Sequence, residues 1–354
     1  MNNDSTSKKT WTSSSINKTV ERCEITGLQT VASYNWLKDS TLVVPGAPGV
    51  VSKDLQSNLQ LTREQGTNVI DENHLRHPSA PLEPLFRSVM LCSPDFDFSD
   101  VDIVSDRNNI RKLHSFLEGT RTKDFRIDVC RVGDLVLLQR VEPKDVDYPE
   151  HAGFGFDFER VYAERDRPHS AGTHRRVVYY DLAGMGMLIG SETDAVLDRN
   201  TDDIEYDLST ALAVVSINNE TTQKDFKDSD LKIRRGGAPL TTVKYDAAEL
   251  CTKAIKFAHE FDYADKWLQM YLAGAKYLLL GFHLRGYITS PELIDIDMCK
   301  ERVEGDPSRN MGRLAALLDE IVDVAQSYPE DVIWTLHFTA STQKLVKKRL
   351  NRYR

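Results

Sequence analysis

Apolar positions recur along the chain at two spacings, and each spacing predicts a different kind of element. A period near 3.6 residues places apolar side chains on one helix face and predicts helices over 108–118, 265–273 and 311–326. Short apolar or alternating runs predict strands over 41–44, 101–104, 125–132, 135–140, 177–187, 232–235, 277–282 and 331–337. Gly133-Asp134 separates two of these runs as a hairpin turn. The mixture predicts an α+β fold in which helices flank mixed β-sheets.

Amino-acid composition predicts the structure of stretches that have no regular apolar spacing. Residues 247–261 are rich in Ala, Glu and Lys and favour a helix. Residues 1–28 hold too few branched apolar side chains to offset the entropy of ordering and are expected to be a disordered tail. One domain is expected over 29–338, with a long polar excursion at 198–230. Residues 339–354 form a basic, helical C-terminal tail, which would be a solvated face, an RNA contact or a localisation signal.

The overall composition argues against several classes of protein, among them membrane-spanning, nucleic-acid-coating and secreted proteins. The 354 residues are 40% hydrophobic and 28% charged, which is typical of a globular protein, and no apolar run is long enough to predict a membrane helix. The net charge of −9 argues against a generic nucleic-acid coat, although it leaves room for a local basic channel. The 5 cysteines form no C-x-x-C pair, and the first residues lack the apolar segment of a secretory signal. An intracellular protein with reduced thiols is therefore expected.

Two carboxylates follow the apolar run at 177–187. Glu192 and Asp194 are two residues apart, so in an extended chain their side chains would lie side by side on one face. Their repulsion favours a cation or a shared proton between them and indicates a hard-metal site, with a solvated polar face as the alternative. Glu159 follows aromatic residues at 154, 156 and 158 and ends a buried run, so its carboxylate also needs a partner.

These pieces form an ordered set of motifs. The set consists of Arg107 after a strand, Gly155-Phe156-Asp157-Phe158-Glu159 as Gly-Φ-x-Φ-Glu, Glu192-Thr193-Asp194 with the carboxylates of Glu-Φ-Asp, Glu249-Leu250-Cys251 at the place of Glu-Φ-Lys, and Gln269 on the next helix. With this set the chain resembles the DXO/Rai-like family of decapping nucleases, as a divergent, fungal-type member. The resemblance covers about residues 80–340. It implies a single DXO-like domain with a core related to the PD-(D/E)XK nucleases.

The resemblance also implies a function. It implies decapping or pyrophosphohydrolase activity and 5′-3′ exonuclease activity on RNA in RNA quality control, with the RNA 5′ end and a 5′-3′ exoribonuclease as partners, no membrane, and a location in the nucleus and/or the cytoplasm. The implied cofactor is Mg²⁺ or Mn²⁺, which oxygen ligands suit. Arg107 and Gln269 would hold phosphate or the substrate backbone, and Glu192 would position water or a second ion. The residues assigned to the metal are Glu159, Glu192, Asp194, Glu249 and the Leu250 carbonyl, and those assigned to catalysis are Glu192, Gln269 and the residue at 251.

One departure from the family motifs concerns the attacking water. Cys251 replaces the lysine of Glu-Φ-Lys, which in the family is thought to orient that water. A thiol supplies neither the charge nor the three donors of an ammonium. Lys253 would lie on the same face of an extended strand, about 7 Å further along, and could substitute in part. Two interpretations stay open, namely an enzyme with slowed chemistry and a catalytically inactive RNA-binding or scaffold homologue.

Two other enzyme classes find little support. The stretch Asp202-Asp203-Ile204-Glu205-Tyr206 approximates the Asp-rich motif of prenyl diphosphate synthases, but it ends in Tyr and lies in a polar stretch. The many predicted strands also disagree with an all-helical synthase. A dinucleotide-binding Rossmann fold is unsupported because no Gly-x-Gly-x-x-Gly follows a strand.

Overall fold

The structure is a computed structural model that describes residues 9–16, 18–21, 23–51, 55–64, 68–147, 153–164, 173–198, 229–236, 245–330 and 332–349. Nearly all of the predicted excursion at 198–230, including the stretch 202–206, lies outside these residues. No helix in the described ranges is long and apolar enough to cross a bilayer. All of the cysteines are unpaired thiols.

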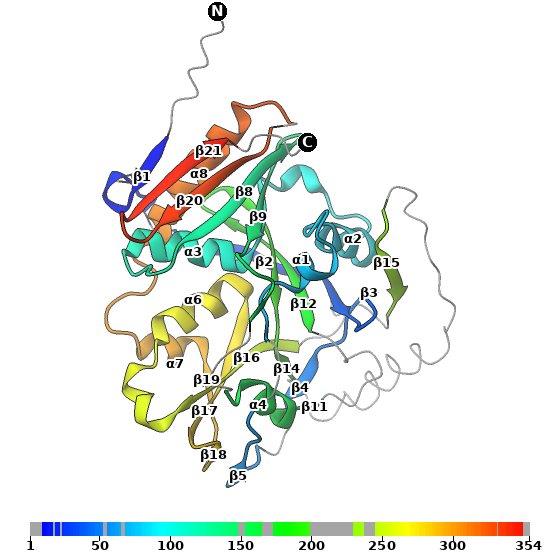
Figure 1. The fold of residues 1–354 in the computed structure, drawn as a ribbon, viewed down its shortest axis with the longest axis vertical. Coiled ribbons are helices and arrows are strands. Elements are labelled where there is room, and N and C mark those ends of the chain that lie inside the picture. The colour runs from blue at the N-terminus through cyan, green and yellow to red at the C-terminus, as the bar shows by residue number, and fades with distance from the viewer. Residues whose placement is uncertain are drawn as a thin grey trace, which may run out of the picture.

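The larger of two main sheets runs from β1 at the upper left of Figure 1, through the centre, to β15 at the right. It is 11-stranded within the described residues and joins strands from both ends of the chain. Its strands, in spatial order, are β1 (Thr10–Thr12), β21 (Lys344–Arg349), β20 (Trp334–Thr339), β8 (Phe125–Val132), β9 (Leu135–Val141), β7 (Ile103–Asp106), β13 (Met185–Glu192), β12 (His174–Leu182), β2 (Ile25–Trp36), β3 (Thr41–Val44) and β15 (Lys232–Arg235).

The second main sheet forms the lower part of the molecule and is 8-stranded within the described residues (Figure 1). Its strands are β11 (Ala163–Glu164), β4 (Gly49–Val51), β14 (Ala195–Asp198), β16 (Tyr245–Ala254), β17 (Ala275–Leu284), β18 (Tyr287–Ile288) and β5 (Leu59–Gln60), with β19 (Glu292–Asp295) paired to β17. A small separate sheet pairs β10 (Val146–Asp147) with β6 (Asn68–Val69). Because β13 and β14 belong to different sheets, the chain crosses between the sheets at Thr193 and Asp194.

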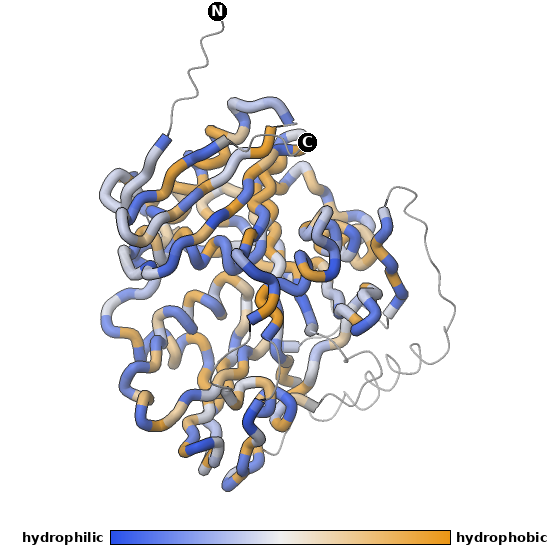
Figure 2. The backbone as a smooth tube through the Cα atoms, viewed as in Figure 1, coloured by the Kyte–Doolittle hydropathy of each residue, from blue (hydrophilic) through white to orange (hydrophobic). Residues whose placement is uncertain are grey.

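Helices pack on the sheets around three hydrophobic cores. The helical segments are η1 (Ser13–Ser15), α1 (Glu72–Arg76), α2 (Glu83–Cys92), η2 (Phe98–Asp100), α3 (Arg107–Glu118), α4 (Gly155–Tyr162), η4 (Ile255–Glu260), α6 (Tyr263–Ala273), α7 (Ile296–Glu301) and α8 (Met311–Gln326). The largest core combines α3, α6 and α8 with strands of both sheets, whereas α2 and α4 each cover a separate core. Figure 2 shows apolar and polar positions alternating along many strands, which lets each sheet bury a face. The α+β, single-domain prediction is confirmed.

The region predicted with the most regular pattern folds as expected. Residues 101–140 form β7, α3, β8 and β9, and β8 and β9 pair as an antiparallel hairpin. Gly133 in its turn has a φ of 59°, a left-handed conformation that glycine adopts without steric cost. The helices predicted over 265–273 and 311–326 are α6 and α8.

Three predictions made from composition differ from the structure. The stretch predicted as a helix over 247–261 contributes most of β16, because it pairs with β14 on one side and β17 on the other, and this pairing overrides its helix propensity. Part of the predicted disordered tail at 1–28 is folded, since β1 pairs with β21 and Trp11 is buried. The predicted helical tail at 339–354 instead contributes β21, which Leu345 anchors in the core.

Candidate functional site

The predicted site residues come together at the corner where the chain crosses between the two sheets. They are contributed by elements that are distant in sequence but adjacent in the fold. These residues are Arg107 at the start of α3, Glu159 on α4, Glu192 at the end of β13, Asp194 before β14, Glu249, Leu250 and Cys251 on β16, and Gln269 on α6.

Asp194 lies at the centre of the carboxylates. Its Oδ2 accepts a hydrogen bond of 2.8 Å from the Leu250 backbone N–H, next to the β14–β16 pairing. Burial and the carboxylates of Glu159, Glu249 and Glu192 raise the pKa of Asp194 well above the usual range of a carboxyl group, and the Leu250 N–H opposes this only in part. The site therefore concentrates negative charge that a proton or a cation would offset.

Glu192 and Asp194 are close, but they do not share one strand as the sequence predicted. β13 ends at Glu192 and β14 begins at Ala195, so Asp194 lies in the crossing segment. Glu192 is exposed, whereas Asp194 is half-buried. A pocket of about 90 Å³ opens beside them and is lined by Asn35, Ala47, Gly49, Phe156, Glu159, Thr173, His174, Glu192, Thr193 and Asp194.

Glu249 is buried and bonded through both carboxylate oxygens. Arg107 Nη1 lies 2.5 Å from Oε1, and Gln269 Nε2 donates to Oε2 at 2.6 Å. Within the described ranges, the His, Cys, Asp and Glu side chains form no group of three that would hold a metal ion in this arrangement. The donor chemistry nevertheless fits a hard divalent cation, because every candidate ligand atom is an oxygen and the charge around Asp194 calls for a counter-ion.

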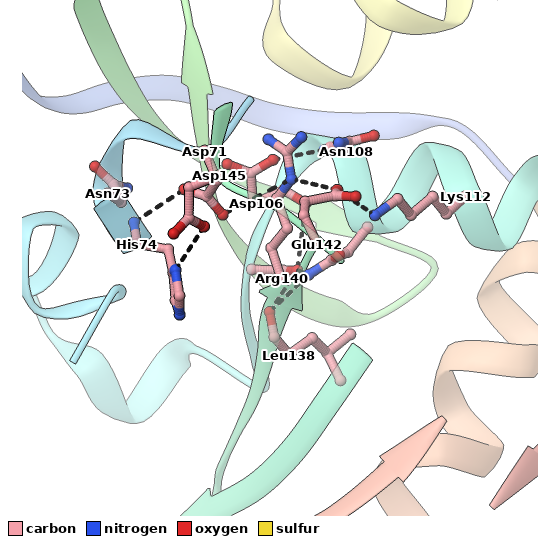
Figure 3. A network of polar contacts seen from close by, with 12 residues as sticks. Asp71, Asn73, His74, Asp106, Asn108, Lys112, Leu138, Arg140, Glu142 and Asp145 are labelled. Carbon is pink, nitrogen blue, oxygen red and sulfur yellow. Dashed lines mark hydrogen bonds and ion pairs between the residues drawn. The ribbon is translucent and has the colours of Figure 1, made fainter. Parts of the chain in front are cut away.

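An ionic network surrounds the start of α3 (Figure 3), and α3 begins at Arg107. Asp106 caps the helix by accepting a hydrogen bond of 2.9 Å from a backbone N–H of its first turn. Burial by itself would raise the pKa of Asp106. The positive charges of Arg140 and other guanidinium groups outweigh this effect, so the pKa lies below its ordinary value and the carboxylate stays charged. Arg140 Nε bonds Glu142 at 2.7 Å, and Lys112 Nζ bonds the same oxygen at 2.6 Å. Arg107 therefore extends from a rigid helix end.

Glu159 lies on helix α4, and the run of aromatic residues before it is not buried throughout, contrary to what the sequence had led us to expect. Phe154 and Phe158 are buried, while Phe156 between them is exposed. Burial at positions four residues apart is the helical pattern, so the apparent two-residue alternation was misleading. Phe158 packs in the core beneath α4, and this places the half-buried Glu159 beside Asp194.

Gly281 on β17 allows α4 to pack closely, and we expect Gly281→Ala to disturb it. An added Cβ would lie 2.5 Å from Phe158 Cε2 and 3.0 Å from Ile288 Cδ1, inside a packed core. Such overpacking should cost about 1–3 kcal/mol of unfolding free energy. Urea unfolding measures this loss. Gly155→Ala is the control, because its Cβ would meet nothing closer than Glu64 Oε1 at 3.5 Å; equal losses in the two variants would contradict the packing argument.

The lysine that lies near Cys251 is not the one that the sequence suggested. Lys253 Nζ donates to the Glu260 carbonyl at 2.6 Å, away from the carboxylates. Lys266 on α6 instead bonds Gln269 Oε1 at 3.2 Å and approaches the Cys251 thiol. Burial raises the pKa of Cys251, and the Lys266 charge and hydrogen bond oppose the rise. The signal for Lys266 was present in the sequence, because it precedes Gln269 by three residues and therefore shares its helix face.

His174 is a second residue that the sequence did not single out. It is buried at the start of β12 and lines the pocket. Its Nδ1 lies 3.0 Å from Asn35 Oδ1, and Nε2 has no hydrogen-bond partner among the described residues. No sequence signal could have found it, because its position depends on strand pairing between β12 and β2.

Comparison with solved structures shows which known proteins have a similar fold. The fold is similar to that of S. pombe Rai1, with a TM-score of 0.63 and 11% identity over 97% of this chain and 100% of that one. For Candida albicans Rai1 in complex with pU5-Mn²⁺ the TM-score is 0.64, with 12% identity over 97% and 93%. For K. lactis Dxo1 in complex with manganese it is 0.62, with 12% identity over 98% and 99%. Identities this low establish a shared fold alone.

Sequence comparison with curated proteins finds no match. A family model described as "Domain of unknown function (DUF8563)" matches residues 15–347, which is most of the chain. Together the comparisons give a family by sequence and a fold by structure. The chain belongs to the DUF8563 family and has the fold of the Rai1 and Dxo1 proteins.

Proposed function

We propose that the protein is a metal-dependent hydrolase that acts on RNA 5′ ends, as a decapping enzyme or pyrophosphohydrolase and a 5′-3′ exonuclease in RNA quality control. The observation that carries the proposal is the convergence of Glu159, Glu192 and Glu249 on Asp194 within the Rai1 and Dxo1 fold. Candida albicans Rai1 was solved with pU5 and Mn²⁺, and K. lactis Dxo1 with manganese, which supports RNA and a divalent cation as the ligands. Mg²⁺ or Mn²⁺ is the proposed cofactor.

The residues divide into those that would hold the cation and those that would hold substrate. Glu159, Asp194 and Glu249 would be the carboxylate ligands, with the Leu250 carbonyl as a further oxygen. A divalent cation bound there would lower the pKa of a water molecule and stabilise charge on phosphoryl oxygens. Glu192, exposed at the pocket, would position water or a second ion, and the donors of Arg107 and Gln269 would hold a phosphate or the substrate backbone.

The proposed partners are the RNA 5′ end and a 5′-3′ exoribonuclease that degrades the RNA once its end has been exposed. The second partner rests on the family resemblance alone. The proposed location is the nucleus and/or the cytoplasm, and the unpaired cysteines agree with a reducing compartment.

The test is hydrolysis of defined RNAs by the purified protein. With Mn²⁺ we expect products from at least one of 5′-triphosphate, NAD-capped or 5′-monophosphate RNA. EDTA should stop the reaction, added Mn²⁺ should restore it, and the double variant Glu192→Ala/Asp194→Ala should be inactive. If none of these RNAs releases product, with either Mn²⁺ or Mg²⁺, the proposal is contradicted.

The alternative is a catalytically inactive RNA-binding or scaffold homologue. Two observations favour it: the thiol at Cys251, and the occupation of both Glu249 oxygens by Arg107 and Gln269. A wild type that binds 5′-monophosphate RNA without cleaving it, together with an active Cys251→Lys variant, would support this alternative over the enzyme.

A further inference from the structure

The face of β16 that carries Glu249 and Cys251 is directed toward α6. Side chains alternate along a strand, and Leu250 between them packs into the core beneath α4. Cys251 packs against the core that contains α6, and Glu249 accepts a hydrogen bond from Gln269 of the same helix. A lysine at position 251 would therefore place its ammonium in the space between β16 and α6.

Lys266 brings an ammonium to that space from the opposite side. Its Nζ donates to Gln269 Oε1 at 3.2 Å and lies close enough to Cys251 for its charge to lower the pKa of that thiol. The same Gln269 side chain also bonds Glu249, because its Nε2 donates to Glu249 Oε2 at 2.6 Å. Ammonium, amide and carboxylate are thus joined in one chain of hydrogen bonds on the Glu249 face of β16.

The backbone that carries Lys266 is held in place at the start of α6. Asp262 caps the helix by accepting a hydrogen bond of 2.8 Å from the Asp265 backbone N–H. The Asp265 carboxylate accepts bonds of 2.7 and 2.5 Å from Arg111 Nη2 on α3. Since Asp265 immediately precedes it, Lys266 extends from a fixed point, and its half-buried side chain is not a mobile surface lysine.

We propose that Lys266 supplies the ammonium that Cys251 cannot, and that it donates a hydrogen bond to the attacking water beside Glu249. An ammonium has three donors, and the bond to Gln269 uses one of them, so donors remain for that water. Lys253, the other candidate, is bonded to the Glu260 carbonyl. This inference rests on the proposed hydrolase function and identifies the residue that would maintain it despite Cys251.

The experiment exchanges the two side chains. Lys266→Met removes the charge at similar length and should lower kcat for Mn²⁺-dependent RNA hydrolysis by about 100-fold or more, with KM changed less than about threefold. Lys266→Arg should retain intermediate activity. The exchange variant Cys251→Lys/Lys266→Met returns an ammonium from the strand and should recover kcat to within about tenfold of wild type. Lys253→Met is the matched control and should behave as wild type.

A second readout separates this role from a structural one. The rise in unfolding temperature on adding Mn²⁺ should be the same in Lys266→Met as in wild type, because the ammonium is not a metal ligand. Recovery in the exchange variant, which lacks the Lys266–Gln269 bond, would show that the charge matters and not that bond. An active wild type with an equally active Lys266→Met, or an exchange variant no better than Lys266→Met, overturns this inference alone. An inert wild type overturns both this inference and the proposed function.

Discussion

Replacement of Asp194 with Asn is expected to abolish Mn²⁺-dependent RNA hydrolysis, with a loss on the order of 1,000-fold or more. Asp194 is the carboxylate on which Glu159, Glu192 and Glu249 converge, so neutralising it removes the shared ligand of the proposed cation. Asn keeps an oxygen that can accept the Leu250 N–H, and the backbone geometry should therefore survive. Single-turnover hydrolysis of 5′-labelled RNA measures the loss.

The same variant should also change stability, in opposite directions with and without metal. In metal-free buffer Asp194→Asn relieves carboxylate repulsion and should raise the unfolding free energy by on the order of 1 kcal/mol. Mn²⁺ should stabilise the wild type and leave the variant unchanged, because a ligand stabilises only a protein that binds it. Asp297→Asn, at an exposed position on α7, is the control for loss of one charge. If millimolar Mn²⁺ does not change the unfolding midpoint of the wild type, the proposed metal site is contradicted.

The local pattern of the sequence predicted the fold class and the elements with a regular apolar spacing, because that spacing depends on neighbours in the chain. The residues of α8 bury one face at helical spacing, and those of β8 and β9 alternate around a turn, so each element carries its own signal. β16 carries no such signal. Its Ala, Glu and Lys residues favour a helix, and they form a strand only because β14 and β17 pair with it from both sides.

The candidate site was also predictable only in part from the sequence. The residue types and their order along the chain were available from the sequence, and they were sufficient to indicate carboxylates, an arginine and a glutamine. Their connections were not available, because the bond between Arg107 and Glu249 joins residues 142 positions apart. Lys266 illustrates the limit best. Its helix face could be inferred from Gln269, but its approach to Cys251 depends on how α6 packs against β16.

The ion pair between Arg107 and Glu249 should be the most costly single contact of the site to break. The two side chains are 9% and 3% exposed and meet at 2.5 Å, so Arg107→Met leaves a buried carboxylate bonded by Gln269 alone among the contacts described above. Breaking such a pair from one side costs about 3–5 kcal/mol, most of it for the uncompensated charge. Urea unfolding of the metal-free protein measures the loss.

Two comparisons separate the uncompensated charge from other effects of Arg107→Met. Adding Glu249→Gln removes the unpaired charge and should restore at least about 2 kcal/mol, so the two changes are non-additive. Arg111→Met removes a guanidinium one turn further along α3, where the pair with Asp265 is 24% and 38% exposed and should be worth about 1 kcal/mol or less. If the Arg107 and Arg111 variants lose the same stability, the burial of the Arg107–Glu249 pair does not set its cost. If Mn²⁺ stabilises Arg107→Met more than wild type, the guanidinium and the cation compete for the same Glu249 carboxylate, as the proposed ligand set requires.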